Sequence, residues 1–294
     1  MVANFRRSLS FPNHPSPSSS SPRTSLHVRS TSLPCRSHPL ISQLKDDLRE
    51  LASWGSNPGD RTSAWLCHGL SGLKAVHDYL DDILQLPQTH ESLRHQGTWV
   101  EKLLEDYLRF VDVYGIFQSL ILALKQEHSA AQVAVRRKDA SKIALYVKDR
   151  KKLGKEIGKL VSTVRSIGNF TDHFHGADVE LAGVIKDVRD VTMMVSASLL
   201  NGISAPFLAQ KSSWMGLRLP KKTKRGKVEE GIEEFRRMGA ESFWGFRKKG
   251  DEEVRMVLKK MHELEDCIAN IETESEGVFR SLIKTRVSLL NVLT

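Results

Sequence analysis

Residues 251–294 read DEEVRMVLKKMHELEDCIANIETESEGVFRSLIKTRVSLLNVLT, and this stretch decides the fold. Apolar residues recur in it at alternating steps of three and four, the heptad pattern of a helix that buries one seam. The twelve seam positions, ten of them apolar, are Val254, Val257, Met261, Leu264, Ile268, Ile271, Ser275, Val278, Leu282, Thr285, Leu289 and Val292. A helix over the whole stretch would be about 66 Å long. We expect its seam to be buried either within one bundle or against another chain.

Helical periodicity also runs backwards from this stretch through most of the chain. Apolar stripes predict helices over residues 40–51, 62–86, 99–132, 140–167 and 177–200, with a weak helix over 228–245. Turn residues at 56–60 separate the first two helices, and Pro87 is expected to stop the second. Because no strand pattern competes, the predicted fold class is all-α, a bundle of long amphipathic helices.

The first 37 residues differ in composition from the rest. Ser and Pro dominate them, and five arginines precede the first acidic residue, Asp46. This composition predicts a disordered, basic N-terminal tail over residues 1–37, followed by a single helical domain over 38–294. A Ser- and Arg-rich leader without acids is also typical of an organelle transit peptide, although its prolines are too dense for an amphipathic mitochondrial helix.

The tail contains two copies of one motif, R-S-x-S-x-P, at residues 7–12 (RSLSFP) and 29–34 (RSTSLP). Phosphorylation of the second serine would create a ligand of the kind that the basic groove of a 14-3-3 protein binds. Two copies 22 residues apart could engage both grooves of a 14-3-3 dimer. The alternative is coincidence in a tail rich in these residue types. The candidate phospho-dependent site consists of Arg7, Ser10, Pro12, Arg29, Ser32 and Pro34.

Basic residues crowd the predicted helix 140–167. The candidate basic patch consists of Lys148, Arg150, Lys151, Lys152, Lys155 and Lys159. One interpretation is a site for an anionic membrane surface, and the other is a solvated helix face. Tyr146 is the single aromatic residue interleaved among these charges, so nucleic-acid binding is not favoured.

An uncharged run at residues 191–210, VTMMVSASLLNGISAPFLAQ, is just long enough to span a bilayer. Its Ser, Thr, Asn, Gly and Pro residues favour instead a buried core helix that ends near Gly202.

No catalytic, cofactor or metal site is predicted. The D-H-x-H cluster of Asp172, His173 and His175 has no second ligand cluster to complete a zinc site. The segment HGLSGLK contains Gly69 and Gly72 but no phosphate-loop pattern, and its small residues favour close approach of a neighbouring helix. Three widely spaced cysteines argue against a disulfide framework and favour a reducing compartment. We therefore expect a non-enzymatic protein of the cytoplasm.

Several segments, taken in order, resemble the plant-specific BYPASS-related family. The segments are RSTSLPCRSHPL (29–40), GLSGLKAVHDYLDDILQLP (69–87), WVEKLLEDYLRFVDVYG (99–115), VRRKD (135–139), DRKKLGKEIGKL (149–160) and FRSLIKTRVSLLN (279–291). Tyr114 stands where the family often has Cys. The resemblance covers nearly the whole chain from Arg29 onward.

The resemblance implies a role in root and shoot development, and it carries over no enzymatic activity, cofactor or catalytic residue. It is also consistent with a plastid or membrane location, since some members have one. Our leading expectation is a non-enzymatic regulatory or adaptor protein that acts through helix-mediated protein contacts and phosphoserine-dependent tail binding, with 14-3-3 proteins as candidate partners. The alternative is a peripheral membrane protein that uses the basic helix 140–167 and the uncharged stretch 191–210.

Overall fold

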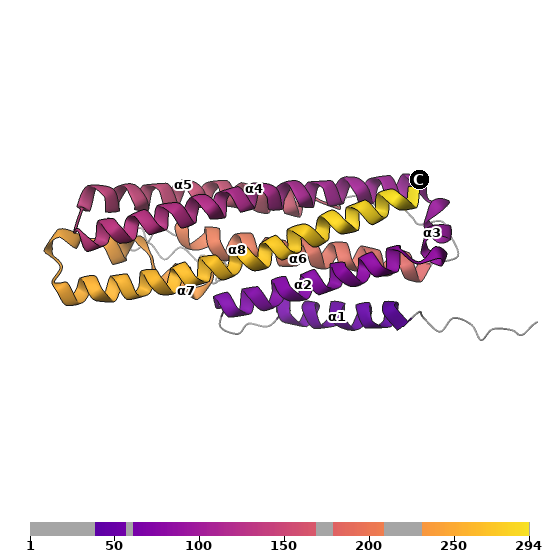
Figure 1. Cartoon of the computed structure of the whole chain (residues 1–294), viewed down its shortest axis with the longest axis horizontal. Coiled ribbons are helices and arrows are strands. Elements are labelled where there is room, and N and C mark those ends of the chain that lie inside the picture. The colour runs from indigo at the N-terminus through magenta and orange to yellow at the C-terminus, as the bar shows by residue number, and fades with distance from the viewer. Residues whose placement is uncertain (1–38, 57–60, 169–178, 209–230, 294) are drawn as a thin grey trace, which may run out of the picture. The chain divides into compact units, whose positions relative to one another are not determined.

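The computed structural model describes residues 39–56, 61–168, 179–208 and 231–293, and all regular structure in these ranges is helical (Figure 1). The all-α prediction is therefore confirmed. In chain order the helices are α1 (Pro39–Ser56), α2 (Ser63–Leu84), α3 (Pro87–Arg94), α4 (Gly97–Arg136), α5 (Ala140–Arg165), α6 (Val179–Leu208), α7 (Glu233–Arg237) and α8 (Asp251–Leu293).

Helix α8 is the central packing element. All twelve seam positions that the heptad count predicts are buried, and α8 lies against both α2 and α4 along much of its length (Figure 1). It runs antiparallel to α4, since Lys138, just after the end of α4, pairs with Asp251 at the start of α8, and Lys125 further back in α4 pairs with Glu272 further along α8. The seam is thus filled by helices of the same chain, which answers the question that the heptad pattern left open.

The other long helices complete the bundle around this seam. Helix α5 packs against α4 and α6, and α6 also contacts α1 and α2. The turn from α4 to α5 contains Lys138, which adopts a positive φ of 53°. Asp139 then caps α5, because its carboxylate accepts hydrogen bonds at 3.2 Å from the backbone N–H groups of Ser141 and Lys142.

Small residues on α2 let α1 approach closely, as the sequence predicts. A Cβ placed on Gly69 would lie 2.3 Å from the Trp54 ring, and one on Gly72 would lie 2.8 Å from Leu51. The Trp54 ring stacks on Trp65 with centroids 4.2 Å apart, and its indole N–H donates to the Trp65 carbonyl at 2.9 Å. Both glycines therefore serve packing between α1 and α2.

The structure differs from the predicted elements in three places. Pro87 follows the end of α2, but it also occupies the first turn of α3, a helix that we did not predict and for which proline is well suited. Helix α6 continues beyond Gly202 to Leu208, with Pro206 inside its last turn. The weak helix predicted over 228–245 is reduced to α7 and the 3₁₀ turn η1 (Ala240–Phe243); a second 3₁₀ turn, η2 (Phe246–Lys248), follows.

The predicted tail falls outside the described residues. Its disorder and the domain boundary at residue 38 therefore remain predictions.

Candidate functional site

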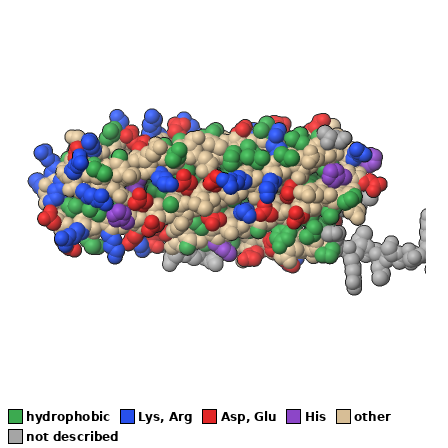
Figure 2. All heavy atoms as spheres, in the orientation of Figure 1, with side chains coloured by type: hydrophobic (Ala, Val, Ile, Leu, Met, Phe, Trp, Pro, Cys, Tyr) green, Lys and Arg blue, Asp and Glu red, His purple; other side chains and the backbone are tan. Residues whose placement is uncertain are grey.

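The lysines of the candidate basic patch lie together on the outer face of α5. Lys148, Lys152, Lys155 and Lys159 are exposed and Lys151 is half-buried. Their spacing of three and four residues places them on one side of the helix. Figure 2 shows Lys and Arg side chains projecting from the upper edge of the molecule, where α5 runs in Figure 1. We call these five residues the lysine face.

Most of the lysine face is not neutralised by nearby acids. Lys159 pairs with Glu156 at 2.8 Å, whereas the other four lysines form no ion pair with any described residue. Lys152 interacts electrostatically with Glu127 of α4, but burial has the larger effect and raises the pKa of Glu127 above its usual range. The face is therefore a positive stripe about 16 Å long, from Lys148 to Lys159.

Arg150 does not belong to this face, which corrects the predicted patch. Its side chain is buried, and Nη1 donates to the Met238 carbonyl oxygen at 2.6 Å. The guanidinium lies 4.4 Å from the Phe207 ring centroid and 5.3 Å from that of Tyr146. Arg150 points inward from α5, and there it joins α5, α6 and the connection that precedes α8.

Some of the other predicted features lie outside the described residues, and others lie within them. Arg7, Ser10, Pro12, Arg29, Ser32 and Pro34 of the tail motif lie outside the described residues, as do Asp172, His173 and His175. Burial raises the pKa of the Cys67 thiol to about 11 and also raises the pKa of the Cys267 thiol. Such thiols stay protonated and unreactive at neutral pH.

Residues 191–208 of the uncharged stretch lie in α6, and its last two residues lie outside the described part of the chain. Helices α4 and α6 are both long and apolar enough to cross a membrane by length and composition. In the bundle, every residue from Val191 to Phe207 is buried or half-buried, and Leu208 is exposed. The described part of this stretch is therefore occupied in packing against neighbouring helices.

A buried polar layer crosses the bundle where α2, α6 and α8 meet, and we did not predict it from the sequence. The His77 ring places Nε2 3.0 Å from the Thr192 hydroxyl and Nδ1 3.3 Å from the Thr285 hydroxyl. Complete burial lowers the pKa of His77 to about 3, against a smaller opposing effect of Asp78, so the ring is neutral. The Tyr107 ring on α4 completes the layer and lies nearly perpendicular to the His77 ring, with the ring centroids 5.7 Å apart.

Two further buried contacts join helices that are distant in sequence. His128 of α4 lies 2.6 Å from the Tyr146 hydroxyl of α5 and 2.8 Å from the Met261 carbonyl oxygen of α8. Tyr114 of α4 lies 3.1 Å from the Ser196 hydroxyl of α6. These groups are enclosed by packed side chains, so their role is to fix the positions of the helices relative to one another.

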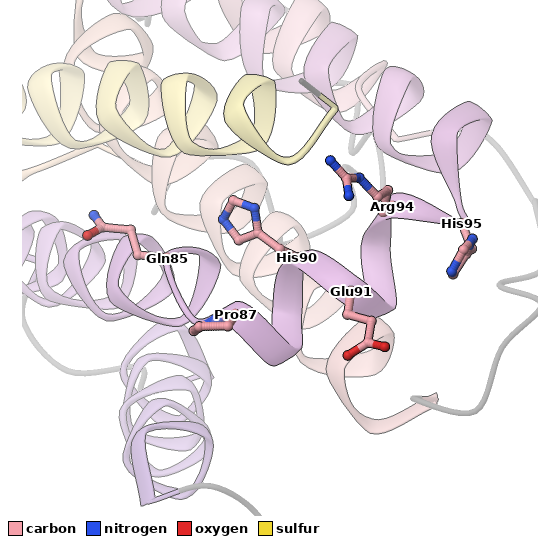
Figure 3. Close-up of a pocket in the computed structure, with 6 residues that line it drawn as sticks. All are labelled: Gln85, Pro87, His90, Glu91, Arg94 and His95. Atoms are coloured by element: carbon pink, nitrogen blue, oxygen red, sulfur yellow. The ribbon is translucent and has the colours of Figure 1, made fainter.

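A surface pocket lies where α2 ends and α3 begins (Figure 3). It is lined by Gln85, Pro87, His90, Glu91, Arg94 and His95. In Figure 3, His90 and Arg94 point to the side on which α8 lies, whereas Glu91 and His95 point away from it. These polar groups therefore do not converge on one point. Among the described residues no group of three or more His, Cys, Asp or Glu could hold a metal ion.

Comparison with known protein families identifies a match. A family model described as Protein BPS1 matches residues 69–292, a range that includes the lysine face, the polar layer and the pocket. No curated protein and no solved structure matches the chain. The matched range covers well over half of the chain and begins after the tail.

Proposed function

The chain belongs to the BPS1 family, which is related to plant development, and we propose that it is a regulatory or adaptor protein of root and shoot development. In this proposal it has no catalytic activity and works in the cytoplasm through helix-mediated contacts with other proteins. A plastid or peripheral membrane location is the alternative.

One observation carries the adaptor proposal: apolar side chains remain exposed where α4 and α8 pack together. Gly115 of α4 lies beside Phe279 of α8, which places these helix segments in contact. The exposed residues nearby are Leu108 (40% exposed), Ile283 (39%), Val287 (48%) and Leu290 (38%), which we call the apolar strip. Figure 2 shows hydrophobic side chains gathered over α4 and α8 in the right half of the molecule. Exposed apolar residues grouped along two packed helices support a docking site for another protein.

The tail would add a regulated contact to this surface. In the proposal, Ser10 and Ser32 are phosphorylated and together engage a 14-3-3 dimer. Support comes from the two copies of the R-S-x-S-x-P motif, which supply an arginine before each serine and a proline after it.

Affinity purification from plant tissue, with and without phosphatase treatment, tests both contacts. We expect 14-3-3 proteins to be recovered without phosphatase and to be lost from a Ser10→Ala/Ser32→Ala variant. A Ser19→Ala/Ser20→Ala variant is the matched control, because these serines lie in the same tail outside both motifs. Val287→Glu/Leu290→Glu should lose partners of the apolar strip and keep 14-3-3 proteins. Equal recovery of all partners by every variant would refute the adaptor proposal.

The lysine face favours a second candidate, a peripheral membrane protein that binds anionic lipid. The supporting observation is that Lys148, Lys151, Lys152 and Lys155 have no ion-pair partner among the described residues. Such lysines each contribute about 1 kcal/mol near an anionic surface. In co-sedimentation with anionic vesicles, Lys152→Glu/Lys155→Glu should bind more weakly than Lys186→Glu/Lys284→Glu, which makes the same charge change elsewhere. Equal binding by these two variants would remove the lysine face from consideration.

A further inference from the structure

Trp244 is held out into solvent by a turn whose other aromatic residues are buried. Its side chain is 64% exposed, whereas Phe243 is 6% exposed and Phe246 is 3% exposed. Phe243 packs edge-on against Tyr146 of α5, with ring centroids 5.7 Å apart. Gly245 adopts a positive φ of 64°, which reverses the chain between Trp244 and Phe246. The exposure of Trp244 is therefore built into an anchored turn.

The turn is tied to the α4–α5 connection through lysines. Lys249 donates from Nζ to the Ser242 carbonyl oxygen at 2.7 Å and lies 5.5 Å from the Phe246 ring centroid. Lys138 donates to the Lys249 carbonyl oxygen at 3.3 Å. These bonds bring two basic segments to the same end of the bundle. We define the basic end as Arg136, Arg137, Lys138, Lys142, Trp244, Arg247, Lys248 and Lys249.

Figure 2 shows Lys and Arg gathered at the left end of the molecule, where α4 meets α5 and α8 begins in Figure 1. Four acids near this end are engaged with neighbours, whereas Glu241 of η1 is exposed and forms no ion pair with a described residue. Asp139 caps α5, Asp251 pairs with Lys138, and Glu252 pairs with Arg255 at 3.6 Å. Glu253 accepts from the Gly250 backbone N–H at 3.0 Å.

Four exposed cations of the basic end have no such partner. Arg136, Arg137, Arg247 and Lys248 form no ion pair with any described residue. The basic end therefore combines one projecting tryptophan with a set of unpaired positive charges.

We propose that the basic end docks on a bilayer containing anionic phospholipid, with the Trp244 indole inserted at the depth of the headgroups. An indole has an apolar body and a polar N–H, and this amphipathic character favours the membrane–water interface. The four unpaired cations meet the lipid phosphates, which attract basic segments close to the surface. A single projecting aromatic offers no platform for successive bases, so a lipid surface fits this end better than single-stranded nucleic acid does. The inference goes beyond the membrane candidate above, which concerns the lysine face and has no apolar anchor.

The test uses the full chain with neutral phosphatidylcholine vesicles and with vesicles that also contain phosphatidylserine. We expect binding to the anionic vesicles alone, and we expect Trp244→Ala and Arg247→Glu/Lys248→Glu each to weaken it about tenfold. The matched controls are Ile116→Ala, another exposed apolar residue, and Lys186→Glu/Lys284→Glu. Both controls should bind like the unaltered protein.

Insertion has a spectroscopic signature that charge attraction alone would not produce. Lipids brominated on their acyl chains should quench the fluorescence of the unaltered protein, and the quenching should be absent from Trp244→Ala. Trp244→Phe should retain intermediate binding, which also decides the matter if the alanine variant fails to fold.

Three outcomes would overturn the inference. The first is no binding to anionic vesicles, and the second is unchanged binding by both basic-end variants. The third is that inositol hexakisphosphate or single-stranded DNA displaces the variants from the vesicles as readily as it displaces the unaltered protein. If Lys152→Glu/Lys155→Glu abolishes binding while the Trp244 variants retain it, the lysine face is the membrane site and the basic end is not. If the reverse holds, the basic end stands and the earlier membrane candidate falls.

Discussion

The hydroxyl oxygen of Thr285 on α8 lies 3.3 Å from Nδ1 of His77 on α2. Thr285 is one of the two seam positions of α8 that are not apolar, and Ser275 is the other. Ser275 also receives a polar partner, since Nε2 of Gln118 donates to its hydroxyl oxygen at 3.0 Å. The two interruptions of the heptad pattern are therefore two of the places where α2 and α4 fix the axial position of α8.

Replacing His77 by Leu should reduce the sensitivity of the fold to acid. The pKa of His77 is about 3 in the folded protein, and its ordinary value is 6.5. As the pH falls below that ordinary value, the unfolded chain binds a proton that the folded chain does not. The free energy of unfolding then falls by up to about 1.4 kcal/mol per pH unit until the pH approaches 3. His77→Leu should lack this component when urea unfolding is measured between about pH 6 and pH 4.

The buried Val76 on the same helix provides the control, because Val76→Ala removes no titratable group and should keep the original pH dependence. The leucine variant should also fold, since the Thr192 and Thr285 hydroxyls donate to the carbonyl oxygens of Val188 and Ser281 in their own helices. Identical pH slopes for both variants and the unaltered protein would contradict the buried neutral state of His77.

Thr285→Val should be costly only while His77 is present. The variant removes a buried partner of the histidine ring, and an unsatisfied buried polar atom costs about 1–3 kcal/mol. When His77 is already replaced by Leu, Thr285→Val leaves no histidine nitrogen unsatisfied, so it should cost less. Urea unfolding of the four proteins of this double-mutant cycle should give a coupling energy of about 1 kcal/mol or more. Simple additivity would show that the 3.3 Å contact contributes nothing.

Arg150→Lys should destabilise the protein despite conserving charge. A lysine cannot reproduce the planar stacking on Phe207 or the bond to the Met238 carbonyl oxygen. We expect a loss of about 2–4 kcal/mol in urea unfolding, because a buried charge would lose its partners. Hydrogen exchange should also quicken across residues 233–248, which the arginine anchors. Lys148→Ala, two residues away and exposed, should change stability by less than about 0.5 kcal/mol.

Gly69→Ala and Gly183→Ala should have opposite effects, although both substitutions occur within helices. The new Cβ at residue 69 would meet the Trp54 ring at 2.3 Å, whereas that at residue 183 has nothing within 4 Å. Overpacking should destabilise the first variant by about 1–3 kcal/mol. Alanine should stabilise the second by up to about 1 kcal/mol through helix propensity. Thermal unfolding of the pair tests the prediction, and a stabilised Gly69→Ala would contradict the tight contact between α1 and α2.

Local periodicity was sufficient to predict the long helices, because each carries a continuous apolar stripe that has to be buried. The predicted start of α5 at residue 140 agrees with the structure, in which Asp139 caps the helix. Helix α3 escaped prediction because Pro87 has two roles, ending one helix and beginning the next. Pro206 lies in the last turn of α6. The helix therefore continues beyond Gly202, where its Gly and Ser residues had predicted an end.

The functional features were harder to predict because they depend on contacts between distant residues. The lysines of α5 could be grouped from their spacing on one helix. Arg150 could not be separated from them, since its partners Met238 and Phe207 lie far along the chain. His77 likewise gains its environment from α6 and α8. Trp244 stands out only once Phe243 and Phe246, its neighbours in sequence, are seen to be buried.

The central position of α8 has a consequence for how the protein is made in the cell. Ribosomes synthesise α8 after every other described helix, yet α2 and α4 both bury their apolar stripes against it. During translation these stripes have no native partner, so the nascent chain exposes apolar surface until α8 has been synthesised. We therefore expect chaperones to hold the emerging chain and the core to close only after translation of α8.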